Sequence, residues 1–93
     1  FTYEDILKID DNGIQLVLKE VNQEDLLISL KTASDELKEK LFSNMSERAS
    51  LMLKEDLESM GPTKISDVEK AQQKIIAVCK TLEESGKIAI GGV

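Results

Sequence analysis

The chain has 93 residues, of which 12 are basic and 18 acidic, so its formal net charge is −6 at pH 7. This length suits one domain with a single modest core. A net negative charge repels phosphate backbones and anionic headgroups, and we therefore expect no nucleic-acid partner. The longest apolar run, residues 75–79, is far shorter than the roughly 20 residues that a membrane-spanning helix needs. We expect a soluble domain.

The sequence holds few groups for catalysis. It has no histidine and a single cysteine. Cys79 falls on the apolar side of a predicted helix, where a plain buried thiol is expected. The common nucleophile–base pairs and most transition-metal sites are therefore absent. We expect no enzyme activity, no cofactor, no metal and no small-molecule substrate.

Helical spacing of apolar residues begins at the first residues of the chain. Thr2 is placed to cap a first helix, with acidic residues in its first turn, where they favour the helix dipole. The Asp-Asp-Asn-Gly run at residues 10–13 is expected to interrupt this helix. A second helix follows, with residues 14, 17, 18 and 21 on its apolar face. Asn22 is suited to cap a third helix with leucines 26, 27 and 30 inward.

Three further helices complete the pattern. Ser34 is expected to cap the fourth, and the fifth spans residues 46–60. The sixth is the longest, starts at the capping-box sequence Ser-Asp-Val-Glu of residues 66–69, and ends at Gly86. Beyond it, residues 87–90 are expected to be briefly extended and residues 91–92 to be flexible. With no long alternating strand pattern, the predicted fold class is all-α, a compact six-helix domain with short connections.

The fifth predicted helix sorts its apolar and charged residues onto different sides. At about 100° per residue, one arc holds Ala49, Met52, Leu53, Leu57 and Met60. Arg48 and Glu55 lie seven residues apart along the flank of this arc, where they can meet a charged partner. Asp56 falls inside the arc, so it requires a cation from a neighbouring helix or an edge that water reaches. Gly61 and Pro62 end the helix, and the glycine suits a left-handed conformation there.

Methionines 45, 52 and 60 are expected to fill the core rather than to form a ligand-binding patch. The acidic pairs at neighbouring helix positions, such as residues 55–56 and 83–84, point about 100° apart. They are therefore expected to be solvated rather than to act as a general acid and base.

Three stretches of the chain resemble a known family. They are LKTASDELKEKLFSNMSERA at residues 30–49, MLKEDLESMGP at residues 52–62 and SDVEKAQ at residues 66–72. In order and spacing they are similar to the C-terminal domain of the flagellar motor switch protein FliG, and the similarity covers essentially the whole chain. Phe1 and Tyr3 resemble the end of a Met-Phe-x-Phe hinge that precedes this domain in the family. The resemblance implies a hinge end at residues 1–3, a six-helix torque-bearing domain at residues 4–86 and a short tail at residues 87–93.

The resemblance also implies a rotor part of the bacterial flagellar motor that receives force from ion-driven stator units. In the family, charged residues on and around the fifth helix, called the torque helix, face the cytoplasmic loop of the stator channel protein. The matching positions here are Lys31, Arg48, Glu55, Asp56 and Lys64. Lys64 stands where arginine is frequent, which removes bidentate pairing at that position. Other implied partners are switch-ring proteins and neighbouring copies in a ring, at the cytoplasmic face of the inner membrane in the flagellar basal body.

The charged positions have a simpler interpretation as well. Without the resemblance, Arg48, Glu55, Lys31 and Lys64 would be taken as solvated helix faces. Asp56 fits an internal salt bridge that holds the fifth helix as well as it fits a stator contact, and both alternatives stay open. The alternative function is an acidic helical interaction module that binds a basic partner and is unrelated to motility. Ring stoichiometry, rotation sense, the stator ion and packing against a preceding domain are not determined by the sequence.

Overall fold

A computed structural model describes residues 1–89 of the chain. In chain order its elements are the 3-10 helix η1 (Tyr3–Lys8), α1 (Asp11–Glu20), α2 (Gln23–Ser29), the 3-10 helix η2 (Leu30–Thr32), α3 (Asp35–Ser43), α4 (Glu47–Ser59) and α5 (Ile65–Glu84). No strand occurs within residues 1–89. Since η2 continues α2 directly, all six predicted helical segments are present, and the all-α fold class is confirmed.

Side-chain caps start three of these helices, and the caps at Asn22 and Ser34 are the predicted ones. The Asn22 side chain accepts from two backbone N–H groups at the start of α2, at 2.8 Å and 3.3 Å. The hydroxyl of Ser34 accepts from Leu37 N at 3.2 Å, and that of Ser46 accepts from Ala49 N at 3.1 Å. Each cap satisfies backbone donors that have no partner inside their helix. These boundaries therefore follow from local sequence chemistry.

The beginning of the chain differs from the prediction. The first helix is a short 3-10 helix, and residues 11–13 do not interrupt it but form the first turn of α1. The reason is that Asp10 caps α1, because its carboxylate accepts from Gly13 N at 2.7 Å. Gly13 itself is buried, and a Cβ at this position would lie 2.5 Å from Ile9 Cγ2. The glycine therefore allows α1 to pack closely on the preceding chain.

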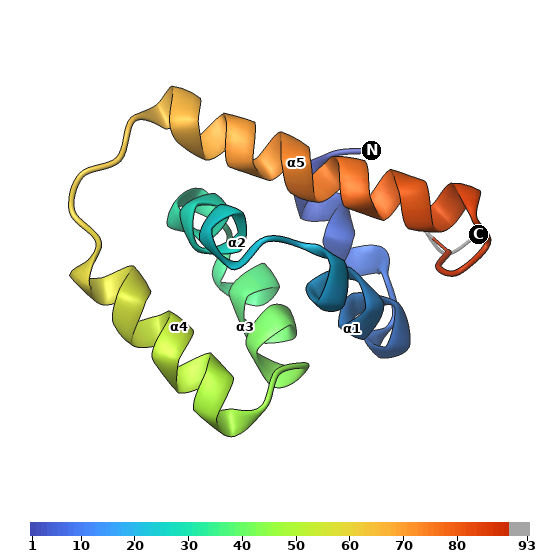
Figure 1. Ribbon diagram of the computed structural model, residues 1–93, viewed down its shortest axis with the longest axis horizontal. Coiled ribbons are helices and arrows are strands. Elements are labelled where there is room, and N and C mark those ends of the chain that lie inside the picture. Colours follow the sequence, from blue (N-terminus) through green and yellow to red (C-terminus); the bar gives the residue numbers. More distant parts are fainter. Residues whose placement is uncertain (90–93) are drawn as a thin grey trace.

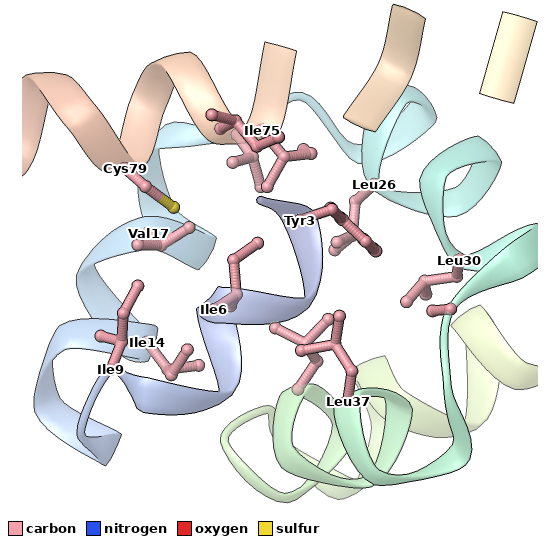
Figure 2. Close-up of a cluster of buried hydrophobic side chains, with 14 of the residues drawn as sticks. Tyr3, Ile6, Ile9, Ile14, Val17, Leu26, Leu30, Leu37, Ile75 and Cys79 are labelled. Carbon is pink, nitrogen blue, oxygen red and sulfur yellow. The ribbon is translucent and has the colours of Figure 1, made fainter. Parts of the chain in front are cut away.

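The 3-10 helix η1 runs through the middle of the core, and Figure 2 shows Ile6 among side chains from α1, α3 and α5. Cys79 of α5 is fully buried there, which confirms the predicted buried thiol. The hydroxyl groups of Tyr3 and Ser29 lie 2.9 Å apart in the core, and Ser29 also donates to Leu26 O at 2.8 Å. These buried polar groups are therefore hydrogen-bonded, as burial requires.

Helix α5 crosses the domain and packs against α1, α2 and both 3-10 helices (Figure 1). It begins at Ile65 with Lys64 as its N-cap residue, so the predicted capping box at residues 66–69 is wrong: these residues already lie inside the helix. At the other end, α5 stops just before Gly86, whose φ of 74° suits glycine.

The packed part of the chain continues past Gly86, where the sequence placed the domain boundary. Ile88 is buried and belongs to the core. The predicted extended stretch at residues 87–90 falls partly outside the described residues, and the predicted flexible glycines 91 and 92 fall entirely outside them.

Candidate partner-binding face of helix α4

Helix α4 lies at the edge of the domain, with α2 and α3 between it and α1 (Figure 1). Only Ser50 and Leu53 of this helix are buried, and Leu57 is partly buried against the core. Met52, which the sequence placed on the inward arc, is 57% exposed. The side of α4 that faces the core is thus turned by about 50° from the predicted apolar arc. The prediction that Met52 fills the core is wrong, whereas Met45 is partly buried as expected.

Ser50 is not in the predicted apolar arc, because serine is a polar residue. Its hydroxyl donates to Glu47 O at 3.0 Å, one turn earlier in the same helix. A serine hydroxyl that donates to a carbonyl of its own helix can be buried without a further hydrogen-bond partner. Its small size also lets α4 approach its neighbours closely.

The same rotation leaves Asp56 outside the buried side of α4. Of the two predicted alternatives, an edge that water reaches is therefore confirmed, rather than a cation from a neighbouring helix. Asp56 is exposed, and within residues 1–89 it forms no ion pair. The structure therefore provides no internal salt bridge for this carboxylate. Water reaches it, which removes the cost of an isolated buried charge.

Arg48 and Glu55 both lie on the outward side of α4, about 170° from the centre of its buried side. Both are exposed, and neither is ion-paired within the described part of the chain. Asp56 belongs to the same helix but points about 80–100° away from them. The structure thus places Arg48 and Glu55 on one side of α4 and Asp56 beside that side.

Lys31 is not part of α4, but its side chain reaches the C-terminal end of that helix. This residue of η2 is partly buried, and its ammonium donates to Met60 O at 3.4 Å. Gly61 does not adopt the left-handed conformation that the sequence predicts. Within residues 1–89, positive φ is found at Gly86 and not at Gly61. A cation at the last carbonyls of a helix provides an alternative cap and a favourable interaction with the dipole. The Lys31 side chain therefore holds the end of α4.

Asn44 has a corresponding role at the other end of α4. Its amide nitrogen donates to Asp11 Oδ1 at 3.1 Å and to Lys40 O at 2.8 Å, while its amide oxygen accepts from Gln15 Nε2 at 3.3 Å. These bonds join the connection before α4 to α1. In the sequence Asn44 lies within one of the matching stretches, but nothing in its local pattern indicates this long-range network.

A further contact fixes the middle of α4. The ammonium of Lys54 lies 5.1 Å from the centre of the Phe42 ring of α3, a cation–π distance. Apolar burial of α4 is limited, so polar and cationic contacts near both ends and in the middle contribute to its orientation.

The remaining predicted site residues lie elsewhere. Lys64 is exposed at the start of α5, after the connection that follows α4. Tyr3 is buried in the core, and this burial raises the pKa of Tyr3 to about 12. Phe1 is 41% exposed and lines a cavity of about 360 Å³ beside Gln72 and Thr32. The two predicted hinge positions therefore differ, with Tyr3 anchored in the domain and Phe1 at its surface.

Within residues 1–89, no cluster of three or more cysteine, aspartate or glutamate side chains is arranged to hold a metal ion. No helix in this part of the chain is both long and apolar enough to span a bilayer.

Comparison with known proteins identifies the family. The family model described as the FliG C-terminal domain matches residues 1–90. The chain belongs to this family. The flagellar motor switch protein FliG of Thermotoga maritima is 61% identical over 90 residues, which cover 97% of this chain and 27% of that protein. FliG of Bacillus subtilis is 48% identical over 90 residues, again 97% of this chain and 27% of that protein.

Solved structures agree with this membership. The crystal structure of FliG residues 116–343 from Helicobacter pylori has a TM-score of 0.95 and 42% identity, covering 98% of this chain and 40% of that one. Full-length FliG from Aquifex aeolicus has a TM-score of 0.90 and 41% identity, covering 92% of this chain and 27% of that one. The FliG resemblance is confirmed, and the chain spans about a quarter of the length of its curated relatives.

Proposed function

We propose that this FliG C-terminal domain is a rotor part of the flagellar motor switch that takes up torque through the outward face of α4. The observation that carries the proposal is the placement of Arg48 and Glu55. They point away from the core and have no ion-pair partner within residues 1–89. Exposed charges without an ion-pair partner are available to another protein. That partner is the cytoplasmic loop of the stator channel protein.

Weak contacts suit this task. An exposed ion pair contributes about 0–1 kcal/mol, so a stator loop can bind, push and release without trapping the rotor. Asp56 lies beside the Arg48–Glu55 line and adds a second acidic group to the same contact. Lys64, exposed at the start of α5, offers a point charge to an acidic group of the stator.

Lys31 acts differently from the other stator-interaction residues. Its ammonium is directed to Met60 O, so it supports stator contact by keeping the C-terminal end of α4 in place. Phe1 and Tyr3 connect the domain to a preceding hinge, and rotation about that hinge presents the charges of α4 from another side. Neighbouring copies and other switch-ring proteins complete the ring at the cytoplasmic face of the inner membrane. In this role the domain performs no catalysis. Membership of the FliG family favours this role over an interaction module unrelated to motility.

Charge reversal tests the proposal. Arg48→Asp in the full-length switch protein places a carboxylate near Glu55 and repels an acidic stator group, so rotation speed should fall while assembled flagella remain. Exposed substitutions usually change stability by no more than about 0.5 kcal/mol, so the melting curve should stay normal. A compensating reversal on the stator loop should restore part of the rotation.

Lys80→Asp is the matched control, because Lys80 is exposed on α5 and its reversal changes the net charge equally. Rotation should be unaffected in this variant. Normal speed in the Arg48→Asp rotor, or equal losses in both variants, would refute the claim that the α4 face carries force.

A further inference from the structure

Two large apolar side chains on α4 are left in water. Leu51 and Met52 are 52% and 57% exposed, and the other large exposed hydrophobics within residues 1–89 are Phe1 and Ile65. Neither Leu51 nor Met52 belongs to the core or packs against it. Single exposed hydrophobics are ordinary, but adjacent ones on a surface often mark a binding site. The fold makes no use of this pair.

The pair lies between the two charges that carry the proposed function. On α4, Leu51 and Met52 fall about 60° and 40° to either side of Arg48 when viewed down the axis. Arg48 lies one turn before the pair and Glu55 one turn after it, and the two charges are about 10 Å apart along the helix. The outward face of α4 therefore has an apolar centre with one charge at each end.

We propose that this face receives a helical segment of another protein, net basic in charge, which buries an aliphatic side chain between Leu51 and Met52. The inference rests on the proposed function and adds an apolar contact to its charged ones. Apolar contact at the centre of an interface excludes water, which strengthens the ion pairs around it. It is also non-directional, so it tolerates the sliding of one helix past another.

The charges on and beside this face indicate a net basic occupant. Helix α4 carries four acidic residues, namely Glu47, Glu55, Asp56 and Glu58, against the two basic residues Arg48 and Lys54, and the whole chain carries a net charge of −6. A partner with excess positive charge is attracted to such a surface, and one acidic group opposite Arg48 completes the match.

A second copy of the chain fits less well. In an antiparallel pair of α4 helices, Arg48 would face Glu55 of the other copy, and the apolar pairs would meet at the two-fold axis. The same register places Glu47 opposite Asp56, which adds like-charge repulsion to that between two chains of charge −6. Another protein is therefore the better occupant.

The test is the double variant Leu51→Gln/Met52→Gln in the full-length switch protein, expressed in cells that lack their own. Glutamine keeps helix propensity and length, so folding and flagellar assembly should be retained. Loss of the apolar contact should weaken partner binding about tenfold, and motor torque at fixed load should fall by roughly half or more. Ile65→Gln is the matched control, because Ile65 is 61% exposed but lies on α5.

Four outcomes separate the possibilities. Lower torque in the double variant, with normal torque in Ile65→Gln, supports the inference. Normal torque in the double variant alongside a loss in Arg48→Asp overturns it and leaves the proposed function standing, whereas normal torque in both rejects the two together. If sedimentation shows that the unmodified protein self-associates and the double variant does not, the occupant is a second copy and the inference is overturned.

Discussion

Three leucines of α4 differ in burial, so truncating each of them tests the rotation of this helix about its own axis. Leu53 is 5% exposed, Leu57 is partly buried and Leu51 is 52% exposed. Substitution of each by alanine changes helix propensity equally. Differences in unfolding free energy among the three variants therefore report burial alone.

The magnitudes follow from these environments. Leu53→Ala should cost about 2.5–3 kcal/mol, toward the lower part of the range for buried leucines, because α4 lies at the domain edge, where neighbours can partly fill the gap. Leu57→Ala should cost about 1–1.5 kcal/mol, in proportion to its partial burial. Leu51→Ala should stay within about 0.5 kcal/mol of the unmodified chain.

Urea unfolding followed by far-ultraviolet circular dichroism measures these differences. The denaturant slope should be the same in all variants, because a changed slope would indicate an altered denatured state or loss of two-state behaviour. A loss in Leu51→Ala as large as that in Leu53→Ala would refute the orientation of α4. A loss below about 0.5 kcal/mol in Leu53→Ala would do the same.

Three further predictions concern two glycines and the buried cysteine. Gly13→Ala should destabilise the chain by about 1–2 kcal/mol, because the new methyl group would lie 2.5 Å from Ile9 Cγ2. Gly61 has open space around it and no positive φ, so Gly61→Ala should stabilise the chain by about 0.4–1 kcal/mol. Thermal or urea unfolding measures both changes. Burial raises the pKa of the Cys79 thiol to about 11, so a thiol reagent at pH 8 should modify it only after unfolding. Since the unfolded thiol ionises first, stability should decrease as pH rises above about 9, and fast labelling of the native chain would contradict this burial.

Local signals in the sequence were sufficient for the helical class and for several helix boundaries. The caps at Asn22, Ser34 and Ser46 need only a side-chain oxygen and backbone donors two or three residues away, so a helix start can be read without knowing the fold. The same holds for the end of α5 at Gly86, where only a left-handed residue is required. Family membership could also be inferred from sequence, because three matching stretches follow one another between residues 30 and 72, and the family model matches residues 1–90.

Several local signals nevertheless failed. Residues 66–69 have a capping-box sequence, but α5 begins earlier, at Ile65. Gly61 could adopt a left-handed conformation after α4, yet the end of that helix is held from a distance by Lys31. Residues 10–13 resemble a loop, but the Asp10 side chain starts a helix there.

The sequence by itself determined that this protein is helical, where most of its helices begin, and which charges belong to helix α4. Only the tertiary structure decided which way α4 faces. A broad apolar arc is compatible with several rotations about the helix axis, and the neighbours that cover one side of it come from distant parts of the chain. Their packing placed Ser50 inside and left Met52 and Asp56 in water. That rotation, of about 50°, sets which side chains α4 presents to a partner.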